Sequence, residues 1–196
     1  MGLTVNSLIT VVDAFNDNRS NIINRENIIF KTSNDHFIDG ETQGDLNLTE
    51  DLIVHSGETL TVNGKLIVNE GTEISIAQGG KLVVRGNITS NSATYVVAEG
   101  AVLQINDYFC SDSDTLDIAG DLVINADASF KSSVITANGI IKFKGDLSTS
   151  SCTWNSPNIA FISKLPQSIS GSAISVNNLN IDNSSATMVM RVIVEG

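Results

Sequence analysis

The sequence predicts an all-β fold, a single-stranded right-handed β-solenoid (parallel β-helix) of about seven coils, preceded by an N-terminal cap. The first observation is a repeated phrase, because Glu58–Asn69 reads ETLTVNGKLIVN and Asp114–Asn125 reads DTLDIAGDLVIN with the same apolar positions. The second is that, from Asp45 onward, short β-branched runs alternate apolar and polar residues, and Gly or Asn precedes most of them. This alternation predicts half-buried strands, and the preceding Gly or Asn predicts corners rather than hairpins.

A glycine-led phrase recurs along the chain, and its spacing indicates the length of one coil. Its copies GDLNL, GKLIV, GNITS, GDLVI and GDLST begin at Gly44, Gly64, Gly86, Gly120 and Gly145. The first two intervals, of 20 and 22 residues, each correspond to one coil. The 34-residue interval that ends at Gly120 predicts an acidic insertion between coils, Asp107–Asp121.

Stacking explains why the same phrase returns. Each predicted coil has an inward row of Leu, Val and Ile and an outward row of Thr, Asn, Lys, Asp and Ser. One coil cannot bury its inward row alone, whereas stacked coils bury it continuously and pair their backbones about 4.8 Å apart. The right-handed preference of parallel crossovers predicts the hand of the winding.

The chain divides into a predicted N-terminal cap, residues 1–40, and the solenoid, residues 41–196. Within the cap, Leu8–Phe15 places apolar residues at helical spacing after Asn6, a residue type that caps helices, which predicts a short helix. Asn27–Thr32 (NIIFKT) predicts a strand. We expect the cap to cover the first coil, because an open solenoid end invites edge-to-edge aggregation.

Composition narrows the expected partners and the compartment. The chain has 196 residues and a formal net charge of −11, which disfavours nucleic acid and anionic membranes. The sequence contains no run of about eighteen apolar residues, so no membrane span is predicted. The first residues have no basic region before an apolar stretch, so no secretory signal is expected. Cys110 and Cys152 are predicted to be free, mostly buried thiols, since two coils separate them by more than a disulfide can reach.

The acidic stretch offers the candidate metal ligands. Carboxylates at Asp107, Asp112 and Asp114 are of the type that binds Ca²⁺. The EF-hand pattern and the glycine-rich nonapeptide of calcium rolls are both missing. The alternative interpretation is an acidic surface insertion without a cation, and no cofactor is predicted.

The sequence contains few residue arrangements that are typical of catalytic sites. There are only two histidines, so no specific Ser–His–Asp arrangement can be assembled, and we predict no catalytic residues and no enzyme. Carbohydrate-binding sites usually present exposed aromatic rings, for which Tyr108 and Trp154 are the candidates. The alternative for Trp154 is a core residue at a point where the coil changes shape.

Two stretches carry a resemblance to a known group of proteins. Residues 58–89 (ETLTVNGKLIVNEGTEISIAQGGKLVVRGNIT) resemble the LTVNGxLxVxG coils of large exported bacterial surface proteins, the adhesin-like, haemagglutinin-like and polymorphic-toxin chains. Gln167–Ser172 (QSISGS) and Asn177–Ser185 (NNLNIDNSS) are similar to a phrase that recurs near the ends of such modules. The resemblance covers about residues 44–185. It implies a β-solenoid that serves as a stalk or scaffold, without a family active site.

The leading functional hypothesis is a non-enzymatic structural module of a bacterial surface or exported protein, supporting adhesion or display. One alternative is a β-helix that binds or cleaves carbohydrate. Another is a cytoplasmic solenoid scaffold that assembles with itself. The expected partners are flanking domains of a longer chain or other solenoid ends, with glycans in the carbohydrate alternative. The expected location is extracellular or at the cell surface as part of a longer chain, and cytoplasmic if the chain is complete.

Overall fold

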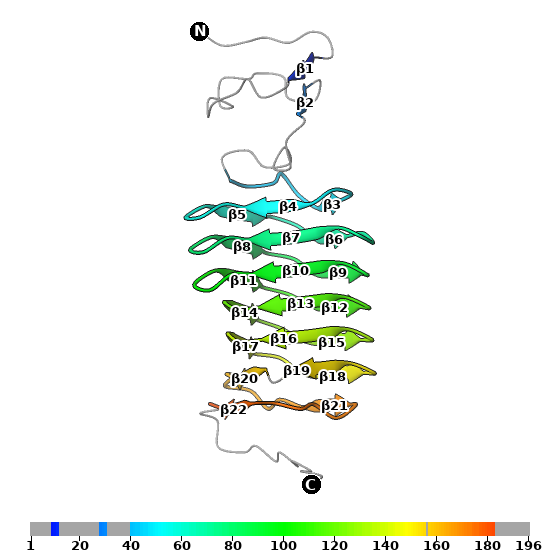
Figure 1. Ribbon diagram of the computed structural model, residues 1–196, viewed down its shortest axis with the longest axis vertical. Helices are drawn as coiled ribbons and strands as arrows, with labels where there is room; N and C mark the ends of the chain where they lie inside the picture. Colours follow the sequence, from blue (N-terminus) through cyan, green and yellow to red (C-terminus); the bar gives the residue numbers. More distant parts are fainter. Residues whose placement is uncertain (1–8, 12–27, 31–39, 156, 183–196) are drawn as a thin grey trace.

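The structure is a computed structural model that describes residues 9–11, 28–30, 40–155 and 157–182. The chain winds into a stack of coils, and each complete coil contributes one strand to each of three parallel sheets (Figure 1). Six coils have three strands, and a seventh contributes two. The predicted β-solenoid of about seven coils, with its right-handed winding, is confirmed.

The strands are short, at three or four residues each, and successive coils stack them in order. The first sheet contains β3 (Leu46–Leu48), β6 (Leu66–Val68), β9 (Ile88–Asn91), β12 (Phe109–Asp112), β15 (Ala128–Lys131), β18 (Leu147–Ser150) and β21 (Ile169–Gly171). The second contains β4 (Leu52–Val54), β7 (Glu73–Ile76), β10 (Thr94–Val97), β13 (Thr115–Ile118), β16 (Val134–Ala137) and β19 (Thr153–Asn155). The third contains β5 (Thr59–Val62), β8 (Lys81–Val84), β11 (Val102–Ile105), β14 (Asp121–Ile124), β17 (Ile140–Phe143), β20 (Asn158–Phe161) and β22 (Asn178–Ile181).

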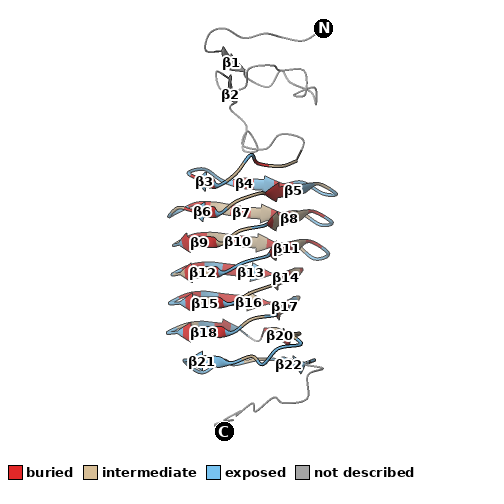
Figure 2. Cartoon of the chain, turned by 180° about the vertical axis from the view of Figure 1, so that it is seen from behind, coloured by how far each residue is buried: buried red, intermediate tan, exposed pale blue. Residues whose placement is uncertain are grey.

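The register places like residues above one another. In the third sheet Leu103 pairs with Leu82 of the coil before and with Leu122 of the coil after, and all three are fully buried. Paired positions lie between 18 and 22 residues apart along the chain. The step from Ile140 to its pair Asn158 is 18 residues, and the step from Thr59 to its pair Lys81 is 22 residues. Figure 2 shows buried residues alternating with half-buried or exposed ones along most strands of the first six coils. The period-two alternation of the sequence therefore separates core from surface, as predicted.

The core changes from aliphatic to aromatic along the stack. The ring of Phe109 meets Tyr95 edge-on at a centroid distance of 5.8 Å and Phe130 at 5.3 Å. Phe143 and Phe161 stack at 5.4 Å in the later coils. Edge-to-face and offset stacked contacts between aromatic rings add to the stabilisation from burial. These rings therefore stabilise the packing of the middle coils against the last ones.

The corner between the second and third sheets has two lengths. In the first three coils it is a four-residue loop, at residues 55–58, 77–80 and 98–101, and these loops project beside β5, β8 and β11 in Figure 1. Each loop contains a glycine with positive φ (Gly57, Gly79 and Gly100). The next two coils turn the same corner with two residues, Ala119–Gly120 and Asn138–Gly139.

The predicted acidic insertion at Asp107–Asp121 is wrong. This segment holds β12 and β13, and the step from Phe109 to its pair in the next coil, Ala128, is an ordinary coil. The 34-residue interval arises because Gly86 precedes β9 in the first sheet, whereas Gly120 precedes β14 in the third. The repeated unit of the sequence is therefore one corner with its strand, and different copies lie on different sides of the coil.

The N-terminal region contains a parallel pair of strands, β1 (Ile9–Val11) and β2 (Ile28–Phe30). The strand predicted within Asn27–Thr32 is confirmed at β2. The predicted helix over Leu8–Phe15 is wrong at Ile9–Val11, where the β-branched side chains favour an extended strand. The rest of that helix, like most of the cap, lies outside the described residues. The described part of the chain contains no helix that could cross a membrane.

Candidate functional site

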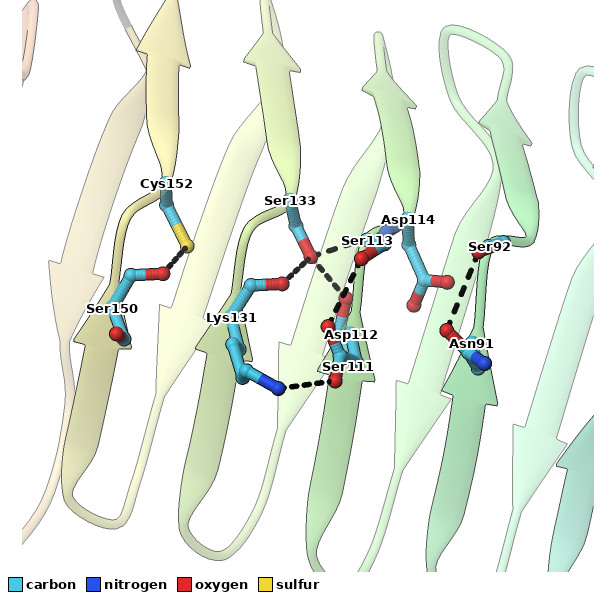
Figure 3. A network of polar contacts seen from close by, with 10 residues as sticks. All are labelled: Asn91, Ser92, Ser111, Asp112, Ser113, Asp114, Lys131, Ser133, Ser150 and Cys152. Atoms are coloured by element: carbon cyan, nitrogen blue, oxygen red, sulfur yellow. Dashed lines mark hydrogen bonds and ion pairs between the residues drawn. The ribbon is translucent and has the colours of Figure 1, made fainter.

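The richest group of polar side chains lies at the corner between the first and second sheets (Figure 3). In the last four complete coils this corner is turned by a serine with positive φ, and these residues are Ser92, Ser113, Ser132 and Ser151. Side chains with a Cβ seldom adopt this conformation, and Ser is not among the residue types most enriched there. The backbone locks each turn to the next coil, since the Ser92 N–H donates to Asp112 O at 2.9 Å and the Ser113 N–H to Lys131 O at 2.8 Å.

Asp114 is the central residue of the corner, and its carboxylate points into the protein. The residue is 1% exposed. Its Oδ1 accepts a hydrogen bond from the Ala93 N–H at 2.8 Å, and its Oδ2 accepts one from the Ser90 hydroxyl. Both donors belong to the coil before, so the side chain fastens one coil to the previous one.

Ser133 continues the connection to the following coil. Its hydroxyl oxygen lies 3.0 Å from the Ser111 hydroxyl and accepts a hydrogen bond from the Asp114 N–H at 3.3 Å. It also donates to the Lys131 carbonyl at 3.0 Å. We name Ser90, Ser111, Asp114 and Ser133 the Asp114 cluster, and all four residues are buried.

The electrostatics of the cluster follow from its burial. Loss of hydration raises the pKa of the Asp114 carboxyl, and the hydrogen bonds from Ser90 and Ala93 act in the opposite direction. Burial also raises the pKa of the Tyr95 phenol, and the nearby charge of Asp114 adds to that effect. The Tyr95 hydroxyl is buried, and no hydrogen-bond partner for it lies among the described residues.

The outer side of the same corner carries an exposed ion pair. Lys131 Nζ lies 2.9 Å from Asp112 Oδ2 in the strand before it. The hydrogen bond with Lys131 lowers the pKa of Asp112 and raises that of Lys131. Cys110 lies on the same strand as Asp112 and is half-buried, and burial raises the pKa of its thiol.

The structure separates the three carboxylates that were the predicted metal ligands. Asp107 accepts a hydrogen bond from the adjacent Tyr108 N–H at the start of β12. Asp112 lies outside at the end of β12 and pairs with Lys131, whereas Asp114 points inward. Within residues 40–155 and 157–182, no three His, Cys, Asp or Glu residues are grouped in a way that could hold a metal ion.

The two aromatic candidates for carbohydrate binding also lie apart. Trp154 is 6% exposed, and its ring meets Phe130 edge-on at 5.6 Å, so the indole belongs to the core and offers no surface platform. Tyr108 is 37% exposed and lies at the corner before β12. Of the two candidate rings, only that of Tyr108 is therefore exposed.

Sequence reasoning missed the Asp114 cluster because a carboxylate in an acidic stretch is expected to face water. A signal existed in the alternation: Asp114 lies two residues before the inward Leu116, the same offset that Ala93 has from Tyr95. Cys110 and Cys152 are free thiols, as predicted, but both are half-buried rather than mostly buried.

Polar ladders on other edges serve the same purpose as the cluster. Asn69 Nδ2 donates to Asn47 Oδ1 at 3.0 Å, and Asn125 Nδ2 donates to Asn106 Oδ1 at 2.7 Å, each across one coil. The site is therefore an internal fastening, chemically suited to holding coils together. No protein-family model matches the chain, and neither a curated protein nor a solved structure matches it.

Proposed function

We propose that this chain is a non-enzymatic structural module of a bacterial surface or exported protein, where it supports adhesion or display. The observation that carries the proposal is that the buried polar groups form hydrogen bonds between neighbouring coils. The Asp114 cluster binds the coil before and the coil after, and the carboxylate reaches no surface on which a substrate could bind. A β-solenoid of this kind is a stiff spacer, since each coil is fixed to its neighbours by backbone and side-chain bonds.

The composition of the outer surface supports the same function. Several outward positions of the first sheet carry small polar side chains, for example Thr89, Ser129 and Ser148, although Ile67 on β6 is 42% exposed. Small side chains give a flat wall that packs poorly against partners, which suits a support better than a recognition surface.

A cytoplasmic scaffold that assembles with itself is the second candidate. It is favoured by the last described coil, where Leu179 and Ile181 are each 38% exposed on β22, the last described strand of its sheet. A carbohydrate-binding function has less support, because of its two candidate rings Trp154 is buried and only Tyr108 is exposed.

The location of the native polypeptide tests the proposal. An antibody raised against the solenoid is used to blot the envelope, medium and cytosol of the source cells, with a cytoplasmic enzyme as the fractionation control. We expect a band in the envelope or medium that is much larger than 20.8 kDa. Protease added to intact cells should remove the envelope-bound fraction while sparing the cytoplasmic control. A band of 20.8 kDa confined to the cytosol would contradict the proposal and favour the self-assembling scaffold.

A further inference from the structure

Side-chain bonds between neighbouring coils are not spread evenly along the stack. Asp114 and Ser133 each form a hydrogen bond with the coil before. The equivalent position of the third coil is Ala93, because the strands that follow pair Thr94 with Thr115. The methyl group of Ala93 can neither donate nor accept a hydrogen bond. The column of buried polar side chains therefore stops at the third coil.

From the third coil to the sixth, aromatic rings and buried polar groups join each coil to the next. Tyr95 meets Phe109 across the junction of the third and fourth coils, and further ring contacts join the fourth coil to the fifth and the fifth to the sixth. Aromatic pairs and buried hydrogen bonds both add to the stabilisation that apolar burial gives. We call these coils, residues 85–155 and 157–161, the second unit.

The first two coils are joined by a separate set of polar contacts. Asn69 Nδ2 donates to Asn47 Oδ1 at 3.0 Å, and the Glu73 N–H donates to Asp51 Oδ1 at 2.8 Å. We call these coils, with the segment that precedes them, the first unit, residues 40–84. Each unit is thus held together by side chains as well as by its backbone.

The junction between the two units relies on backbone pairing and on burial of mainly aliphatic side chains. β6 pairs with β9, β7 with β10 and β8 with β11. Between residues 63–84 and 85–105, all of which the structure describes, there is no side-chain hydrogen bond, ion pair or ring contact. An exposed ion pair, Arg85 with Glu41 at 3.8 Å, reaches past the second coil, and such pairs contribute little. The junction therefore has fewer stabilising contacts than the junctions on either side of it.

We propose that the solenoid contains a breakpoint between its second and third coils, at which the first unit opens as a whole while the second unit stays folded. In a stack of repeats the stability is a sum of terms for the coils and for their interfaces, so cooperative unfolding stops at a weak interface. The opened first unit extends to roughly 150 Å, at about 3.4 Å per residue. The chain thus lengthens under tension without losing its remaining coils. The breakpoint follows from the contacts between coils and is independent of where the protein acts.

Hydrogen exchange of the full chain, followed by mass spectrometry in increasing urea below the unfolding transition, is the first test. Strands β7 and β13 give a matched comparison, because both lie in the second sheet and both have four residues. We expect the amides of β7 to exchange at least about tenfold faster than those of β13, given the ring contacts and buried hydrogen bonds of the second unit. Peptides from both coils of the first unit should share one urea dependence, with a smaller slope than that of the second unit. A single opening common to β7 and β13, or a boundary at any other junction between the first coil and the sixth, would overturn the proposal.

A disulfide across the junction is the second test. Ile67 and Thr89 are outward residues that pair directly between β6 and β9. Paired strands place their Cα atoms about 4.8 Å apart, which is within disulfide range. In a chain that carries Cys110→Ser and Cys152→Ser, the pair Ile67→Cys and Thr89→Cys should form a disulfide upon mild oxidation. The disulfide should slow the exchange of β7 at least about tenfold relative to the reduced form, because it ties the first unit to the second.

The matched control is a disulfide in the same sheet within the second unit. Ser129 and Ser148 are outward residues that pair directly between β15 and β18, and the loop that a disulfide between them closes has a similar length. In the same cysteine-free chain, Ser129→Cys with Ser148→Cys should leave the exchange of β7 unchanged upon oxidation. Equal slowing by the two disulfides, or no slowing by the disulfide across the junction, would refute the breakpoint.

Discussion

The hydroxyl of Ser90 donates a hydrogen bond to the carboxylate of Asp114, which lies 24 residues later and in the next coil of the solenoid. The same carboxylate accepts the Ala93 N–H, so both of its oxygens are bound to the previous coil. A buried carboxylate is costly when charged, and here its place in the fold is held by donors from a neighbouring coil. The cluster thus makes part of the stability of the solenoid sensitive to protonation.

We predict that Asp114→Asn flattens the pH dependence of stability. Because burial raises the pKa of Asp114 in the folded state, its contribution is fully present below the unfolded value of 3.8 and is lost as pH rises through the raised folded pKa. Urea unfolding of the parent chain between acidic and neutral pH should therefore contain a component that falls with pH, and this component should vanish in Asp114→Asn. Asp117→Asn, which changes an exposed carboxylate on β13, is the control that should leave it unchanged. Equal slopes in the parent and Asp114→Asn chains would contradict the prediction.

Close stacking at a two-residue corner predicts a large effect of Gly139→Ala. A Cβ at Gly139 would overlap the carbonyl oxygen of Gly120 in the coil before it. We expect a loss of about 3 kcal/mol in the free energy of unfolding, since neither backbone can move without breaking the ladder. Gly44→Ala has open space around its Cβ and should change the stability little. Chemical denaturation of both variants checks this, and similar midpoints would show that the corner can relax.

The serine corners predict that backbone conformation limits substitution at positions that are otherwise exposed. Ser132 has a φ of 52°, a conformation that a β-branched residue tolerates poorly. Ser132→Val should lower the free energy of unfolding by about 1–2 kcal/mol. Ser129→Val, three residues earlier on the extended strand β15, should be neutral because β-branched side chains suit strands. The difference between the two melting temperatures is the measurement, and two equal values would count against the strain.

The burial of Trp154 predicts a useful optical signal. As the only tryptophan, it should show blue-shifted fluorescence that acrylamide quenches weakly in the folded chain and strongly after unfolding. Trp154→Ala should cost about 3–5 kcal/mol, because it leaves a cavity beside Phe130. Strong quenching in the native state would place the ring at the surface and restore it as a carbohydrate platform.

The separation of the acidic side chains predicts no response to calcium. Asp112 is occupied by Lys131, and Asp114 points into the core, so neither is free to join Asp107 around an ion. The melting temperature should therefore be the same in about 1 mM Ca²⁺ and in chelator. An increase in calcium that Asp107→Asn removes would show that a site forms after all.

Much of the fold could be predicted from the sequence because its main signal is local. The alternation that buries Leu82 and leaves its neighbours half-buried is visible within a single strand, and a coil near twenty residues follows from the first glycine-led phrases. The glycine-led phrase alone does not show at which of the three corners of a coil it lies. Gly64 precedes the first sheet and Gly120 the third, yet both need a tight turn before a strand, so the sequence looks alike while the geometry differs.

The Asp114 cluster could not be predicted for a different reason. Whether a carboxylate at a corner points in or out depends on donors supplied by a neighbouring coil, here the Ser90 hydroxyl and the Ala93 N–H. Their distance along the chain is known only once the corner lengths are known. The N-terminal strand was missed because its short apolar run fits a helical and an extended pattern equally, and pairing with β2 decided between them.

The two lengths of corner between the second and third sheets have a practical consequence for engineering. The register of β11 with β14 is unbroken although the corner shortens from residues 98–101 to Ala119–Gly120 in that step. Residues inserted at the corner between the second and third sheets should therefore leave the pairing of the strands unchanged. The ridge formed by residues 55–58, 77–80 and 98–101 is the natural place to graft a foreign epitope or a catalytic loop, with grafts on successive coils displayed about 4.8 Å apart.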